Sequence, residues 1–430
     1  MNHFHRKLYP LASIAAGMCT LAVALPAAAV DLKTADGAWT FSIDGNVNVD
    51  YIYSNCESAS SVKPVVTIGG ACTGTASGSS VSSVANGLLP AAFSFGVATT
   101  QAGIDLAAHL GLYPGIATND GGSPNLQQTA GGTTNVALGT TGLDVRQVYM
   151  TFGNKDIGTF TLGRNFGLFG FDAIISDMTL LGVGVGGAAS GPSPANTTLG
   201  SIGFGYIYTD TLGQMNYTTP DFNGANLTLG IFEPVNSLTE PGTAAGKKAP
   251  GFHGKLAWKG TFGDVKVSLS ATGIEQQQDY DLTATTSGSF QSVGGDVFAK
   301  VDIGGLSLMA SGYDGKGLGT TGLFFLADDG HGNGRPSNGF LLQATYTVDQ
   351  VKFGVNYGVS RLAFANQADR LATPFLLSEN AKVTGGVYYN LTKNLTLLGE
   401  VSWVQTTAHF DSSLNNNTSV DGNIGAFLAF

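Results

Sequence analysis

The chain has 430 residues, of which 62 are glycine, and only 12% are charged although 43% are hydrophobic. This composition excludes a charged disordered chain, and it lacks the richness in Ala, Glu, Lys and Leu of a helical protein or coiled coil. The formal net charge of −10 at pH 7 argues against a nucleic-acid partner, because phosphate contacts need a basic surface. Abundant glycine instead favours β structure with many loops.

The first 29 residues are predicted to be a signal peptide. They combine two basic residues, Arg6 and Lys7, with an apolar core over about 11–25 and the small residues Ala27, Ala28 and Ala29. A membrane anchor is disfavoured because the apolar stretch is shorter than the roughly 20 residues of a span. We therefore expect cleavage after Ala29 and one mature domain over 30–430, with 18 basic and 30 acidic residues and a net charge of −12.

Two cysteines remain in the mature chain, Cys56 and Cys72, both inside one stretch rich in Gly, Ser and Thr. In an oxidising export compartment such a pair favours a local disulfide, with free thiols as the alternative. Their separation fits no zinc-site spacing, and no histidine lies nearby.

Segments of about ten residues with strict apolar–polar alternation recur along the mature chain, as in Val351, Phe353 and Val355 with Lys352 between them. This period of two predicts strands whose two faces meet different surroundings. We expect sixteen strands, near 38–53, 89–99, 101–112, 142–153, 157–165, 211–219, 224–232, 251–260, 263–274, 293–303, 305–314, 338–348, 350–361, 380–390, 393–406 and 420–430.

The gaps between these segments alternate between long and short. The eight long gaps are rich in Gly, Ser, Thr and Asn: 54–88, 113–141, 166–210, 233–250, 275–292, 315–337, 362–379 and 407–419. Sixteen antiparallel strands with loops at one end and seven short turns at the other give this alternation, and both termini then lie at the turn end.

Closure of the sheet follows from energetics. Sixteen strands in an open sheet would leave two unpaired edges and too large a twist, whereas a closed barrel of this size is too wide for side chains to fill. Its lumen must then hold water, so that polar side chains face inward and apolar ones face lipid. No run of 18 apolar residues follows the leader, which excludes a helical membrane protein. The predicted fold class is an all-β transmembrane antiparallel barrel.

Motifs over 142–178 and 217–224 identify a family. The first region reads LDVRQVYMTFG, GTFTLGRNFG and then SDM, and the second reads YTTPDFNG. Together with the leader, the strand count and a last strand ending on Phe430, these motifs resemble the general diffusion porins of Gram-negative outer membranes. The resemblance implies a third loop that folds into the barrel, a homotrimer in the bacterial outer membrane, and passive diffusion of small hydrophilic solutes and ions.

The resemblance also implies roles for three residues. Arg146 matches a strand arginine that lines the pore constriction, Asp177 matches an acid on the inward-folded loop facing it, and Asp172 matches a further loop acid. Opposed charges across a narrow wet gap would create a field that orients dipolar solutes and biases ions. A structural salt bridge is the alternative interpretation of the same pair.

Arg164 shares parity with Phe160 and Leu162, so it is expected to point outward. A charge facing lipid is costly, and we therefore expect Arg164 at a subunit interface, paired with a carboxylate of a neighbour. The same parity rule predicts that Gln147 points outward.

Inward-facing charges are unevenly distributed along the chain. Asp44, Asp50 and Asp105 lie on early strands, whereas inward lysines lie mostly on later ones: Lys255, Lys259, Lys266, Lys300, Lys352 and Lys382. With the acidic net charge, this distribution predicts a moderate preference for cations.

Other functions find little support in the sequence. Residues 182–187 satisfy G-x-G-x-x-G, but no βαβ unit surrounds them; the four mature histidines are scattered, and no catalytic motif occurs. We expect no cofactor, no metal and no enzyme activity. A porin selective for a sugar or small organic ion, or a surface adhesin built on the long loops, remains an alternative.

Overall fold

The computed structural model describes residues 30–58, 65, 67, 69–73, 78–116, 143–186, 197–237, 243–244, 247–283, 286–410 and 416–430. The predicted signal peptide over 1–29 lies outside these residues.

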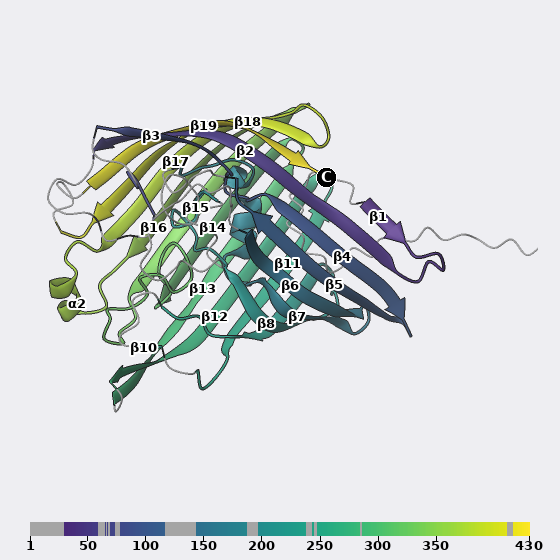
Figure 1. The fold of residues 1–430 in the computed structure, drawn as a ribbon, viewed down its shortest axis with the longest axis horizontal. Helices are drawn as coiled ribbons and strands as arrows, with labels where there is room; N and C mark the ends of the chain where they lie inside the picture. Colours follow the sequence, from purple (N-terminus) through teal and green to yellow (C-terminus); the bar gives the residue numbers. More distant parts are fainter. Residues whose placement is uncertain are drawn as a thin grey trace, which may run out of the picture.

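Sixteen antiparallel strands form a closed barrel, as predicted (Figure 1). They are β2 (Thr40–Ser58), β4 (Ala92–Gln101), β5 (Ile104–Pro114), β6 (Leu143–Asn154), β7 (Gly158–Phe166), β8 (Thr211–Thr218), β9 (Ala225–Phe232), β11 (Gly251–Phe262), β12 (Val265–Thr283), β13 (Thr286–Ile303), β14 (Leu306–Lys316), β15 (Pro336–Val348), β16 (Val351–Leu362), β17 (Leu377–Asn390), β18 (Leu395–Ala408) and β19 (Asn416–Ala429). The last strand, β19, pairs with β2 over Asn46–Ser58 and closes the wall.

The wall has an apolar outer face and a polar inner face. On β16, Phe353, Val355 and Tyr357 are exposed on the outside, whereas Asn356 between them is buried. The exposed apolar side chains mark the surface that lipid covers in a membrane.

Three short strands and three short helical segments complete the fold: β1 (Val30–Lys33), β3 (Ser80–Ala85), β10 (Thr243–Ala244), α1 (Phe171–Ser176), the 3₁₀ turn η1 (Met178–Leu180) and α2 (Gln367–Ala372). Within the described part of the chain, no helix has the length and apolar character needed to cross a membrane.

The two ends of the barrel differ as the gap lengths predicted. Short turns join strands at one end, where Phe430 and Gly45 exchange two backbone hydrogen bonds of 2.9 and 3.0 Å. The carboxy terminus and β1 lie at this end, opposite α2 and β10 (Figure 1). We call them the turn end and the loop end; in outer-membrane barrels short turns face the periplasm.

One expected long loop is wrong. The gap predicted over 275–292 is instead mostly strand, because β12 and β13 continue as paired strands to Thr283 and Thr286. This segment is mostly polar, so it lacks the continuous apolar face on which the strand prediction depends.

The third long connection, residues 167–210, folds into the barrel, as the resemblance implied. We call it the third loop; its described parts are 167–186 and 197–210. Many of its side chains are buried inside the barrel, including Phe169, Leu180, Phe204 and Ile207.

The first long connection is tied to the barrel by a disulfide between Cys56 and Cys72. Cys56 lies near the loop end of β2, and the backbone N–H of the neighbouring Ala71 donates to Thr406 Oγ1 on β18 at 2.9 Å. The disulfide therefore holds this segment against the inner wall.

Candidate functional site

The candidate site is the barrel interior where the third loop narrows it. The loop leaves the end of β7 and forms α1, whose buried face packs on inward apolar side chains of the wall. Ala173 and Ile174 belong to one apolar cluster with Phe298 on β13 and Met309 on β14. This contact explains why two normally polar inner positions carry large apolar residues.

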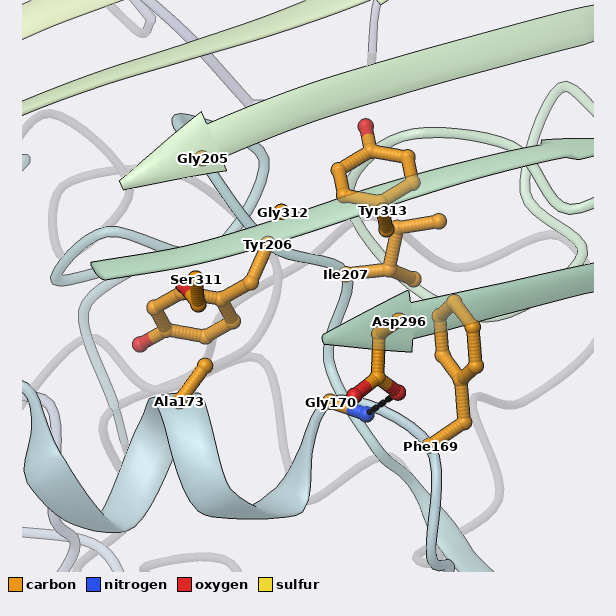
Figure 2. Close-up of a pocket in the computed structure, with 10 residues that line it drawn as sticks. All are labelled: Phe169, Gly170, Ala173, Gly205, Tyr206, Ile207, Asp296, Ser311, Gly312 and Tyr313. Carbon is orange, nitrogen blue, oxygen red and sulfur yellow. Dashed lines mark hydrogen bonds between the residues drawn. The ribbon is translucent and has the colours of Figure 1, made fainter. Parts of the chain in front are cut away.

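Wall carboxylates bind the backbone of the third loop at two places. Asp296 on β13 accepts a hydrogen bond of 2.9 Å from the Gly170 N–H at the start of α1 (Figure 2). Farther along, Glu400 Oε2 on β18 accepts from the N–H groups of Val183 and Gly184, both at 2.8 Å.

Asp421 on β19 extends this arrangement and accepts from the Gly186 N–H at 2.9 Å. Charge-assisted hydrogen bonds of this kind are about twice as strong as neutral ones. These three carboxylates therefore hold the loop through its backbone N–H groups.

The end of the first connection meets the third loop inside the barrel. The Leu88 N–H donates to the Gly182 carbonyl at 2.7 Å, and the Leu89 N–H to the Leu180 carbonyl at 3.2 Å. Asn46 on β2 donates in turn to the Pro90 carbonyl at 2.9 Å. Two inward-folded segments thus form one layer across part of the lumen.

Arg146 lies at a β-bulge on β6. Gly111 on β5 pairs with Gln147 and Leu112 pairs with Val145, so Arg146 is the extra residue. Its Nε donates to Asp144 Oδ2 at 2.7 Å, and its Nη1 lies 3.5 Å from the Tyr208 hydroxyl of the third loop. Arg146 therefore reaches the interior, where a carboxylate of its own strand neutralises it.

The bulge makes the prediction for Gln147 wrong. One extra residue reverses the parity of a strand, so Val148 and Met150 point outward and Gln147 is buried inside. Its amide donates to Asn165 Oδ1 at 2.8 Å.

The two predicted loop acids have separate partners. Asp177 is buried and accepts from the Tyr206 hydroxyl at 2.9 Å, from Asn356 at 3.2 Å and from the Thr179 N–H at 3.0 Å. Asp172 on α1 pairs with Lys255 on β11 at 3.1 Å and accepts from Ser270. The hydrogen bonds of Asp177 thus fold the third loop and join it to β16, whereas Asp172 and Lys255 form a compact, partly exposed ion pair.

Arg164 occupies an outward position, between Val148 on β6 and Gly213 on β8 in the register. Asp210, just before β8, interacts electrostatically with Arg164. Burial raises the pKa of the Asp210 carboxyl, while the positive charges of Arg164 and Arg146 lower it. An acid of the same chain thus partly compensates Arg164.

A chain of hydrogen-bonded residues whose side chains contain no carboxylate, ammonium or guanidinium follows the inner wall from β5 to β11: Tyr113, Gln147, Asn165, Gln214, Asn216 and His253. Its links join side chains, except that the Gln214 amide donates to the backbone carbonyl of Asn165. We call it the amide belt. Gly230 on β9 is the register partner of both Asn216 and His253, and a Cβ there would lie 1.7 Å from Asn216 Oδ1. Only a residue without a side chain lets the belt cross β9.

The remaining predicted pore charges are all on the inner face, at different depths. Asp105 and Lys266 are exposed, and Asp44 and Lys352 are half-buried. Asp50 is fully buried and accepts from Asn423 at 2.8 Å. Asp50 therefore contributes to the packed layer rather than to the open lumen.

The sequence reasoning missed the carboxylates that hold the third loop, namely Asp296, Glu400 and Asp421. The alternation of the strands does not reveal their contacts with a loop that lies 126 to 235 positions away in the sequence. Within the described ranges, no group of three or more His, Cys, Asp or Glu side chains could hold a metal ion.

Comparison with known families decides the identity of the fold. A family model described as Gram-negative porin matches residues 12–409. The chain belongs to the Gram-negative porins. It is accordingly a channel protein of the bacterial outer membrane, and the family points to a channel rather than an enzyme.

Solved structures agree on the fold at low sequence identity. The porin is similar to the outer-membrane channel DcaP of Acinetobacter baumannii, with 12% identity, a TM-score of 0.60 and coverage of 93% of this chain and 99% of that one. It is also similar to OprB of Pseudomonas putida (11% identity, TM-score 0.56, 92% and 95% coverage) and to Salmonella typhi OmpF in complex with daunomycin (12%, 0.54, 93% and 100%). No curated protein matches the chain.

Proposed function

We propose that this porin is a passive channel for small hydrophilic solutes and ions, exported through the predicted leader over 1–29. The observation that carries the proposal is a closed wall with a polar inner face, narrowed by the third loop. Arg146, Asp172 and Asp177 lie around this loop, but the first two are paired with Asp144 and Lys255. Locally compensated charges give a weak transverse field, which suits general diffusion better than recognition of one strongly charged solute.

Liposome swelling tests general diffusion. We expect swelling rates that fall steeply with the size of neutral sugars and hardly distinguish isomers of equal size. Strong preference for one sugar would indicate a selective porin instead, and no flux would refute the channel.

We also propose a mild preference for cations. The support is the net charge of −10 together with Asp44 and Asp105, which face the lumen near the turn end. The reversal potential of purified channels in a planar bilayer under a KCl gradient measures this preference. Clear anion selectivity would contradict the charge argument.

A homotrimer is the assembly we propose, with the outer face of β2 and β4–β7 as the interface. An apolar depression of about 640 Å³ lies there, lined by residues that include Phe95, Val148 and Met150. The outward guanidinium of Arg164 neighbours Val148, and burial against another subunit removes it from lipid. A structure described as the trimer form of Vibrio cholerae OmpT shares the fold with 12% identity, a TM-score of 0.51 and coverage of 91% of this chain and all of that one.

Mass measurement of the detergent-solubilised protein tests the assembly. We expect a trimer for the unmodified chain and a weakened one for Val148→Glu, whereas Val387→Glu, an exposed position on β17, leaves the trimer intact. A monomer at every concentration would refute the proposal.

A further inference from the structure

Four inward lysines share one sector of the lumen, on β11–β16: Lys259, Lys266, Lys300 and Lys352. Their inward direction follows from exposed apolar neighbours on the outer face, such as Leu256 and Phe262 on β11 and Leu269 on β12. We call this sector the lysine wall. It begins beside the 263–264 turn and rises toward the pair formed by Lys255 and Asp172.

The strand register brings two of these lysines together. Ser268 on β12 is the partner of Lys259 on one side and of Lys300 on the other. Adjacent strands are about 4.8 Å apart, so the two lysines start about 10 Å from each other. A lysine side chain is long and flexible, and both ammonium groups can therefore converge above the Ser268 hydroxyl.

Few negative charges compensate this sector. Asp302, the register partner of Lys266, lies 3.4 Å from the Lys300 ammonium, and both side chains of that pair are about one-third exposed. Lys352 lies over the Tyr388 ring, with its ammonium 4.2 Å from the ring centroid. For Lys259 and Lys266 the described residues offer no ion pair.

Two further acids in the turn-end half of the barrel lie on another sector. Asp44 is on β2 and Asp105 on β5, where Asp105 accepts from Thr100 at 2.6 Å. The lysines therefore cluster on one side of the turn-end half, together with Asp264 and Asp302, whereas Asp44 and Asp105 lie on another side.

We propose that the lysine wall is a binding site for small multivalent anions that carry phosphate or carboxylate groups and enter from the turn end. Such an anion relieves the repulsion among Lys259, Lys266 and Lys300 and accepts hydrogen bonds from at least two of them. A monovalent anion can satisfy only part of the site. Binding needs only the folded barrel, whereas its effect on permeation rests on the proposed channel function.

Titration calorimetry of the detergent-solubilised oligomer with inorganic pyrophosphate tests binding without conduction. At low salt the Debye length is long, about 30 Å at 0.01 M, so the lysine charges are weakly screened. We expect saturable heat of binding under these conditions and none at high salt. The triple variant Lys259→Gln, Lys266→Gln, Lys300→Gln is expected to bind about tenfold more weakly. Glucose serves as the uncharged ligand and gives no saturable heat.

Lys155→Gln is the matched control. Lys155 lies in the short turn between β6 and β7, at the same end, and is exposed beside Asp156. We expect the Lys155→Gln substitution to leave pyrophosphate binding unchanged. The single variant Lys266→Gln, at an exposed position, covers the case in which the triple variant does not fold, and it weakens binding about twofold to threefold.

Planar-bilayer recording on the same preparation separates the two proposals. We expect pyrophosphate to reduce the KCl current more strongly from the turn end than from the loop end. Current without pyrophosphate binding, or equal binding by the triple variant and Lys155→Gln, overturns the lysine-wall site. Binding without any current supports the site and overturns the channel.

Discussion

Glu400 offers the sharpest test of how the third loop is held. Its carboxylate accepts two backbone hydrogen bonds of 2.8 Å from Val183 and Gly184, and its other oxygen accepts from the Tyr388 hydroxyl. The side chain is buried on β18. A glutamine at this position can still accept from both N–H groups and offer its own N–H to the tyrosine oxygen, but it carries no charge.

The expected effect is graded. Hydrogen bonds to a charged group contribute about 1.5–3 kcal/mol each and neutral ones about 0.5–1.5 kcal/mol, so Glu400→Gln should loosen the loop by about 2 kcal/mol. That corresponds to about a thirtyfold shift between the held and released loop. Glu400→Leu removes both acceptors and should cost about 3–5 kcal/mol, because two buried N–H groups lose their partner.

Single-channel recording reads out this shift. We expect fluctuating conductance in Glu400→Gln and a larger mean conductance in Glu400→Leu, as the loop leaves the lumen. Gly182→Ala perturbs the same contact from the other side, because its Cβ would lie 2.2 Å from Glu400 Oε1.

Glu379→Gln is the control for loss of a carboxylate. Glu379 on β17 pairs with Arg361 at 2.8 Å in a largely exposed ion pair, which should contribute less than about 1 kcal/mol. If Glu400→Leu conducts like the unmodified chain, or Glu379→Gln changes conductance equally, the wall carboxylates do not hold the loop.

Three further predictions concern stability. Gly230→Ala should lower the unfolding free energy by about 1–3 kcal/mol, because its Cβ would lie 1.7 Å from Asn216 Oδ1 and break the amide belt. Gly385→Ala is the control, since no atom lies within 4 Å of its Cβ, and it should leave the melting temperature unchanged. Equal melting temperatures for the two variants would refute the steric argument. Burial raises the pKa of Asp369, but hydrogen bonds from Arg335, the Ala365 N–H and Thr373 together hold that pKa below the usual 3.8. Since the lowered pKa belongs to the folded state, the carboxylate stabilises the α2 connection above pH 3.8, and this contribution is lost as pH falls through the lower folded pKa. The difference in melting temperature between the unmodified chain and Asp369→Asn should therefore stay constant between pH 7 and about 5 and shrink below about pH 4. A difference that changes near pH 6 would contradict this prediction. Reduction, or Cys72→Ser, opens a link between residues 16 positions apart and should destabilise the first connection by about 3 kcal/mol, read out as faster proteolysis at the loop end without loss of the barrel.

The strands were predictable because lipid and water impose a period of two on every span. Val351 to Val359 alternates so regularly that no tertiary information was needed, and the predicted range 350–361 differs from β16 by one residue at each end. The outer part of the β12–β13 hairpin lacks this constraint. Around Gln276 and Gln278 both faces are polar, and nothing in the pattern separates a strand from a loop.

The site was less predictable, because it depends on departures from the regular pattern. A single extra residue at Arg146 moved Gln147 from the outer to the inner face, and no feature of the sequence marks a bulge. The roles of Asp296 and Glu400 depend on backbone groups of a distant segment. These contacts are visible only in the folded chain.

The seam between β2 and β19 constrains how this protein can be made. Asp50 and Asn423, hydrogen-bonded across it, lie 373 positions apart. Until the final strand arrives, both borders of the curved sheet have unsatisfied amides, which hydrocarbon does not tolerate and which invite aggregation in water. β2 can therefore pair with β19 only after the rest of the chain has been made, and closure of the barrel has to coincide with its insertion into the bilayer. Export and insertion consequently need chaperones that bind the nearly complete chain while its sheet is still open.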